Sequence, residues 1–200
     1  MHMPMQGFSA GVEPGGLYRM ADIQLLICYM LGSVGEPLPR TTVMDIVAGG
    51  GMANFFETTE ALEGLLTAGS VTQSEDAEQL LTLEENGRIA VETLRSRLPL
   101  TLRERSAKAA IQALARRHNE RDSDVSITDL THGCTVTCAI RDEEAPLLSL
   151  SLKVGEHQQA EYIREHFLDD SGLLYRSILS ILTGRAEIRE EDGRTVIHVL

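Results

Sequence analysis

The sequence predicts an α+β protein in which a mainly helical N-terminal domain is joined by a connecting helix to an antiparallel β-meander covered by a helix. Three observations predict this class. Apolar residues recur at helical spacing through the first half, and the period changes from 3.6 to 2 after Asp124. The 200 residues lie between one large domain and two small ones, and an apolar fraction of 42% allows packed cores.

We expect residues 1–17 to be a disordered leader, because they contain Gly and Pro without apolar periodicity and have neither Lys nor Arg. A secretory signal needs a basic start and an apolar block, so we expect a cytoplasmic protein. No apolar stretch reaches the roughly 20 residues that a transmembrane helix needs, so we expect no membrane partner.

Residues 18–100 have the pattern of a helix, a short helix, a third helix, a hairpin and a fourth helix. The first helix is predicted to end at Gly35, and its buried positions are Ile23, Leu26, Ile27, Met30 and Leu31. In the second helix, Thr42 and Asp45 have the spacing of a capping box. The glycines at 49–51 are expected to end that helix and form a turn.

The third helix is predicted from about residue 53 to a break at Gly69. Its inward row is Phe55, Leu62, Leu65 and Leu66. Two short strands, 71–73 and 80–83, follow around a polar tip and predict a hairpin. The apolar positions of the helix after the hairpin are Ile89, Val91 and Leu94.

This order of elements is that of a winged helix-turn-helix. The run L-x-x-L-L-x-x-G-x-V from Leu62 to Val71 and the segment LTLEENGR, 81–88, resemble the recognition helix and wing of PadR- and MarR-like transcriptional regulators. The segments NFF, 54–56, and RLP, 97–99, are closer to an uncharacterised clostridial-type family, a domain of unknown function with an N-terminal winged helix. The resemblance covers about residues 18 to 182. It implies a regulator that binds double-stranded DNA, as a homodimer because paired half-sites need two reading helices.

The charge distribution is unusual for a DNA-binding protein. The net charge of −12 argues against general affinity for nucleic acid. The third helix has glutamates but no Lys or Arg, and the hairpin tip adds Glu75, Asp76 and Glu78. The candidates for DNA contact are at the starts of the second and third helices and on their flanks: Arg40, Thr41, Thr42, Asn54, Thr58, Thr59, Arg88, Arg103 and Arg105. Alternatively, the threonines cap helices and the arginines pair with nearby acids.

Residues 101–121 predict a basic connecting helix. Thr101 and Glu104 fit a capping box, and the apolar side is Ala107, Ala110, Ile111 and Leu114. The cations of this helix either bind phosphates or offset the acidic surfaces on both sides of it.

Residues 122–200 are predicted to form a dimerisation or sensor domain. Three alternating strands make an antiparallel meander, followed by one or two helices with a break at 169–172. The face that would cover the sheet is Ala160, Ile163, Phe167, Leu174, Ile178, Ile181 and Leu182. Leucines in 173–182 either supply a dimer interface or only cover their own sheet. Asp192-Gly193 predicts a further hairpin.

Chemistry is not evident in the sequence. His132, Cys134 and Cys138 fall on one face of a strand, but four residues separate the two thiols by about 13 Å, too far for one ion or one disulfide. We expect the cysteines to be small core residues. No motif of a hydrolase, metalloprotease or phosphate loop occurs, so we expect no enzyme, metal or cofactor. The alternative to a regulator is a protein-protein interaction module that uses the same acidic winged helix.

Overall fold

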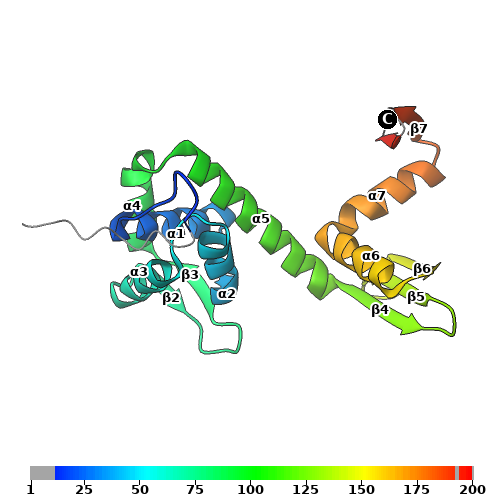
Figure 1. The fold of residues 1–200 in the computed structure, drawn as a ribbon, viewed down its shortest axis with the longest axis horizontal. Coiled ribbons are helices and arrows are strands. Elements are labelled where there is room, and N and C mark those ends of the chain that lie inside the picture. The colour runs from blue at the N-terminus through cyan, green and yellow to red at the C-terminus, as the bar shows by residue number, and fades with distance from the viewer. Residues whose placement is uncertain (1–11, 192–193, 200) are drawn as a thin grey trace, which may run out of the picture. The chain divides into compact units, whose positions relative to one another are not determined.

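The structure, a computed structural model, describes residues 12–191 and 194–199. The chain forms two compact units, Met1–Leu114 and Ala115–Leu200, which divide within one long helix. Both units combine helices with small antiparallel sheets (Figure 1), so the predicted α+β class is confirmed. No helix in the described ranges has the length and apolar character to cross a lipid bilayer.

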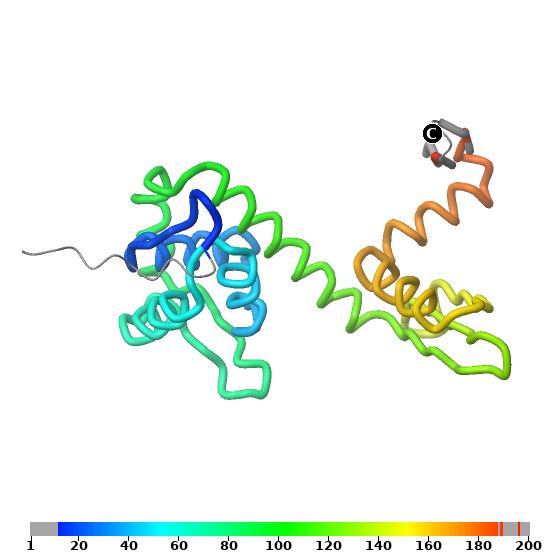
Figure 2. The backbone as a smooth tube through the Cα atoms, viewed as in Figure 1, coloured from blue at the N-terminus to red at the C-terminus, as the bar shows by residue number. Residues whose placement is uncertain are grey.

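Unit 1 contains helices around a small sheet. Its elements are α1 (Met20–Val34), β1 (Leu38–Pro39), α2 (Arg40–Met44), a π-helical turn (Asp45–Gly49), α3 (Phe55–Thr67), β2 (Val71–Gln73), β3 (Leu80–Leu83), α4 (Glu85–Leu94), a 3₁₀ turn (Arg95–Arg97) and the first part of α5 (Leu100–Asp122). The strand order is β1-β3-β2, and all pairs are antiparallel. Figure 2 shows the chain running out along β2 and returning along β3, which confirms the predicted hairpin.

The core of unit 1 is built around α1. The apolar residues of α1 that were predicted to be buried are completely or almost completely buried. The helix ends at Gly35, whose φ of 69° forms a left-handed cap. From α3, Ala61, Leu62 and Leu65 pack into the same core, together with Val71 and Leu81 of the hairpin. The leucine row of α3 therefore fixes which side of this helix faces outward.

Two details at the starts of helices differ from the prediction. The helix α2 begins at Arg40, directly after Pro39, so Thr42 lies inside the helix and does not cap it. Phe55 is 58% exposed, although its spacing placed it in the inward row. The buried positions of α3 begin one turn later, at Thr58, so the periodicity is correct but its first member lies outside the core.

Apolar residues of α4 and α5 also correct the prediction. Ile89 and Leu94 are exposed, because α4 touches the core mainly through Gly87 and Val91. Ile111 of α5 is exposed as well. The buried positions of α5 are Leu102, Ser106 and Ala110. This helix begins at Leu100, so Thr101 is a helical residue rather than a cap.

The predicted flexible leader does not extend to residue 17. The backbone N–H of Glu13 donates to Gly51 O at 2.9 Å, and that of Leu17 donates to Met52 O at 2.7 Å. The Leu17 side chain is buried in the core of unit 1. Residues 1–11, also predicted as leader, lie outside the described residues.

Unit 2 contains the predicted meander. Its elements after α5 are β4 (Ser123–Asp129), β5 (Cys134–Ile140), β6 (Leu148–Val154), α6 (His157–Asp169), α7 (Ser171–Leu182), β7 (Ala186–Glu191) and β8 (Arg194–Val199). The sheet order is β4-β5-β6, and α6 covers one face of it (Figure 1), packing Ala160 and Phe167 against Val136. The predicted helix break is present: Asp170 lies between the helices, and its carboxylate accepts from Leu173 N at 2.8 Å.

The helix α7 does not complete the predicted cover of the sheet. Leu174 packs against the core of unit 2, but Leu173, Leu179 and Ile181 are exposed and Leu182 is 78% exposed. The strands β7 and β8 pair with Ala186 opposite Val199. The predicted turn at Asp192-Gly193 lies outside the described residues.

Candidate functional site

The outward surface of α3 and the adjoining hairpin form the first candidate site. The residues opposite the leucine row of α3 are Phe56, Thr59, Glu60, Glu63 and Thr67. This helix is capped by Asn54, whose side-chain oxygen accepts from Phe56 N at 2.8 Å. The Thr58 side chain is completely buried and donates to Asn54 O at 2.7 Å. Asn54 and Thr58, both candidates for DNA contact, are therefore occupied inside the protein.

Among the arginine candidates, Arg40 contacts α3 directly. One of its terminal nitrogens lies 2.7 Å from Glu63 Oε1, and the other donates to Gln73 Oε1 at 3.1 Å. Arg40 therefore joins the start of α2 to both α3 and β2. Next to it, Thr41 is exposed and Thr42 is half-buried.

Of the remaining candidates, Thr59 lies on α3 itself, and the other three are arginines of α4 and α5. The Thr59 hydroxyl donates to Phe55 O at 2.9 Å within its own helix. Arg88 lines a cavity of about 440 Å³ with residues of α1 and β3. Arg105 donates to Gly50 O at 2.8 Å and lies 3.0 Å from Glu13 Oε2, while Arg103 is half-buried on α5. Of the predicted arginines, only Arg40 adjoins the outward surface of α3.

Carboxylates dominate this surface. Glu60 and Glu63 are exposed on α3, and Glu75, Asp76 and Glu78 form the hairpin tip. Asp76 also has a structural role, because its Oδ1 accepts from Glu78 N at 3.0 Å and from Gln79 N at 2.9 Å. These two bonds hold the turn in which Gln79 adopts a φ of 51°. The surface is therefore acidic, and one of its carboxylates, that of Asp76, stabilises the turn of the hairpin.

An aromatic pair lies at the start of α3. Phe55 and Phe56 pack edge to face, with ring centroids 5.9 Å apart and an interplanar angle of 87°. Phe56 is 79% exposed, the most exposed large apolar side chain described. Exposed aromatic rings are enriched at surfaces that bind other proteins.

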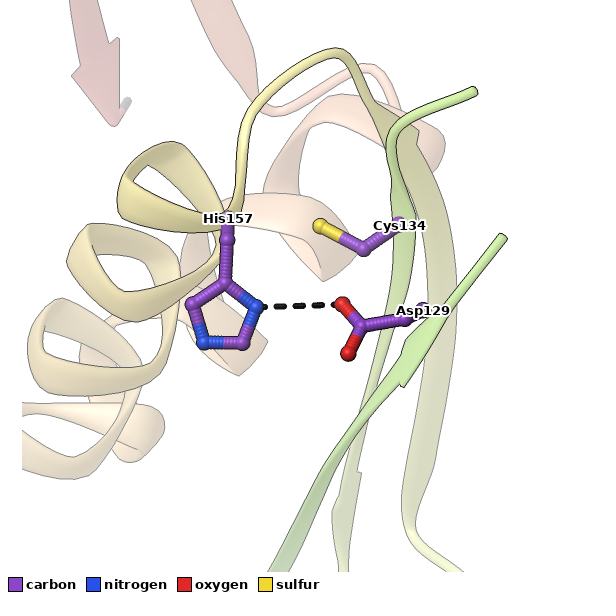
Figure 3. A group of neighbouring side chains, drawn as sticks. All are labelled: Asp129, Cys134 and His157. Atoms are coloured by element: carbon purple, nitrogen blue, oxygen red, sulfur yellow. Dashed lines mark hydrogen bonds and ion pairs between the residues drawn. The ribbon is translucent and has the colours of Figure 1, made fainter. Parts of the chain in front are cut away.

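Unit 2 contains a second group of chemically capable side chains. Asp129, Cys134 and His157 place one possible ligand atom each within 4.8 Å of the others (Figure 3). His157 Nδ1 lies 3.2 Å from Asp129 Oδ1. The sequence predicted none of this grouping, because its members come from two strands and a helix. The one signal in the sequence was the short spacing of Asp129 and Cys134 on either side of the predicted THG turn, 131–133.

The other cysteines are core residues, as predicted. Burial raises the pKa of the Cys28 thiol to about 11 and also raises the pKa of Cys138. Both thiols are therefore held in the protonated form at neutral pH, and neither is equipped as a nucleophile.

Comparison with known proteins identifies the family. Residues 23–182 match a family described as a domain of unknown function (DUF4364). The match covers most of the chain, so the protein belongs to this family, and the predicted membership of an uncharacterised family is confirmed. Neither a curated protein nor a solved structure matches the sequence.

Proposed function

We propose that residues 18–100 of this DUF4364 protein form a winged helix-turn-helix and that the chain regulates transcription as a homodimer bound to double-stranded DNA. The order of elements in unit 1 carries the proposal: α1, β1, α2, α3 and then the hairpin β2–β3, with sheet order β1-β3-β2. In helix-turn-helix proteins the second helix of the motif enters the major groove. Here that helix is α3, and its outward row lies at the surface.

Arg40 is the residue that would bind the DNA backbone. To do so it exchanges Glu63 for a phosphate. Because Glu63 is largely exposed, this ion pair contributes only about 0 to 1 kcal/mol, and the exchange costs little. Thr41 and Thr59 add hydroxyl groups next to Arg40 and along α3.

The acidic surface determines how such binding responds to salt. Each phosphate contact contributes about 0.9 to the slope of log affinity against log salt, and many DNA-binding proteins make 6 to 10 contacts. One arginine from each of two protomers gives a slope of only about −1.8. Affinity for a specific site is therefore expected to fall about 12-fold between 50 and 200 mM salt. Non-specific affinity is expected to be very low.

Fluorescence anisotropy with the DNA upstream of the protein's own gene tests this proposal. The full chain is titrated at 50 and 200 mM salt, and Arg40→Gln is compared with Arg95→Gln, a control outside the α3 surface. We expect the wild type and Arg95→Gln to show the same shallow slope of log affinity against log salt. Arg40→Gln is expected to bind weakly, and its affinity is expected to depend hardly at all on salt. No binding at 50 mM salt would overturn the proposal of DNA binding.

The homodimer is supported by α7. Half of this helix is leucine or isoleucine, and several of these side chains are exposed, most of all Leu182. Exposed apolar side chains gathered on one helix are normally covered by another surface. A second copy of α7 would cover this surface. Light scattering after size exclusion is expected to give a dimer, and Leu182→Ser, which removes no core contact, is expected to shift it toward the monomer.

The second candidate function is a protein-protein interaction module. Phe55 and Phe56 support it, because aromatic residues are enriched at protein interfaces and the surrounding carboxylates repel phosphate. The partner would present an apolar pocket with basic residues around it. If DNA fails to bind and Phe56→Ser abolishes capture of a partner without loss of stability, this candidate replaces the regulator.

A further inference from the structure

We propose that Asp129, Cys134 and His157 form a binding site for one Zn²⁺ ion in unit 2. All three lie at the same end of the β4–β6 sheet (Figure 3). Asp129 is the last residue of β4 and lies directly opposite Cys134, the first residue of β5. His157 is the first residue of α6, which starts after β6 on the other side of Cys134.

The distances suit a metal ion. Zinc bonds of about 2.0 to 2.3 Å in a tetrahedral arrangement place neighbouring ligand atoms about 3.3 to 3.6 Å apart. The separation of His157 Nδ1 and Asp129 Oδ1 is 3.2 Å, and all three ligand atoms lie within 4.8 Å of one another. The Cys134 thiol lies 3.6 Å from Glu156 O, to which it donates. Small movements of these side chains therefore close the site around one ion.

The donor set selects the metal. A thiolate, an imidazole and a carboxylate suit Zn²⁺, whereas Mg²⁺ and Ca²⁺ prefer oxygen ligands alone. Cys134 is buried, while Asp129 and His157 are exposed. Three protein ligands with one side toward solvent leave the fourth position open, as in zinc sites that bind an external ligand. Such a site would allow unit 2 to sense zinc.

Two neighbouring residues support the arrangement. Glu161, one turn along α6, has its Oε1 3.5 Å from His157 Nε2. A carboxylate on the far nitrogen is the usual partner of a metal-binding histidine, because it fixes the ring with Nδ1 toward the metal. Gly133 lets the loop between β4 and β5 approach β6: its φ is +81°, and a Cβ there would lie 2.1 Å from Val154 O. The loop thus holds Asp129 and Cys134 close to the start of α6.

Zinc binding by the full-length protein is the test. The metal-free protein is titrated with Zn²⁺ against a chromogenic chelator and, separately, with Co²⁺. We expect one ion per chain and a thiolate-to-cobalt charge-transfer band. His157→Asn and Asp129→Asn are expected to weaken Zn²⁺ binding by more than about tenfold, and Glu161→Gln by about 10- to 100-fold. His166→Asn, on the same helix but distant from the group, is the matched control.

The outcomes separate the zinc site from a simple ion pair. Cys134→Ser is expected to remove the charge-transfer band, and thermal unfolding shows whether this buried substitution preserves the fold. His157→Asn and Asp129→Asn alter exposed side chains, so they keep the test decisive if Cys134→Ser does not fold. Wild-type protein that binds less than one ion per chain, or binding that survives His157→Asn unchanged, would overturn the proposal. None of these measurements involves DNA, so their outcome is independent of the proposed regulation.

Discussion

Replacing Gly133 by alanine is expected to destabilise unit 2 by about 2 to 5 kcal/mol. Two effects contribute. A left-handed conformation costs a residue with a Cβ about 1 to 2 kcal/mol, and Gly133 has a φ of +81°. Overpacking costs about 1 to 3 kcal/mol, and the new Cβ would lie 2.1 Å from Val154 O. That carbonyl belongs to the backbone of β6, opposite Cys134, so it cannot move without disturbing the strand pairing.

Hydrogen exchange followed by mass spectrometry localises the effect. We expect peptides from β5 and β6 of Gly133→Ala to exchange faster, while peptides from α1 and α3 exchange as in the wild type. Gly155→Ala is the matched control, because no atom lies within 4 Å of its Cβ position and its φ is not positive. This control is expected to be neutral or slightly stabilising. If the two variants exchange equally, strain at Gly133 does not hold this end of the sheet.

Three further predictions concern the core, the pH dependence and thiol reactivity. Leu62→Ala is expected to lower the free energy of unfolding, measured with urea, by about 2 to 5 kcal/mol, whereas Phe56→Ala is expected to change it by less than about 0.5 kcal/mol. Equal losses in the two variants would contradict the orientation of α3. The hydrogen bond from Arg116 lowers the pKa of Glu165 in the folded protein. The pair therefore contributes fully to folding stability above the ordinary glutamate pKa of about 4.3, and this contribution is lost as pH falls through the lower pKa of the folded state. Glu165→Gln should therefore flatten the acid limb of the unfolding profile, and an unchanged limb would argue against this pair. Cys28, with its pKa raised to about 11, should resist alkylation at pH 8 until the protein unfolds; rapid modification of the native protein would contradict its burial.

The helices and strands could be predicted because their burial repeats within one segment. The predicted apolar row of α1 is buried, as are Leu62 and Leu65 of α3, while Leu66 is partly buried. Errors occur where an apolar residue lies at the end of a row or on a helix with few core contacts. Phe55 precedes the first buried turn of α3, and Ile111 lies away from the line of Leu102 and Ala110 on α5. Local periodicity gives the direction of a side chain but does not give the extent of the surface that covers it.

The group in unit 2 could not be predicted for a different reason. Along β5 the strand geometry separates Cys134 from Cys138, so the spacing of these two thiols was no reason to expect a metal site there. The partners of Cys134 are set by pairing between segments. Asp129 lies next to Cys134 because the register of β4 and β5 pairs these two residues. His157 lies near them because α6 begins at His157, shortly after β6 ends. Neither register nor the position of a helix start follows from spacing along a single strand.

Glu63→Gln separates the two candidate functions of unit 1, because it changes them in opposite directions. Glu63 neutralises Arg40, so the substitution releases a cation and removes a carboxylate from the surface of α3. If α3 binds DNA, affinity increases, because Arg40 no longer has to leave Glu63 to reach a phosphate, while the salt slope stays at about −1.8 because the number of phosphate contacts is unchanged. If the same surface binds a basic protein partner, affinity decreases instead. Glu60→Gln is the control, because it removes a nearby charge without releasing Arg40. If Glu60→Gln changes DNA binding as much as Glu63→Gln does, then binding at this surface is governed by net charge and not by the exchange at Arg40.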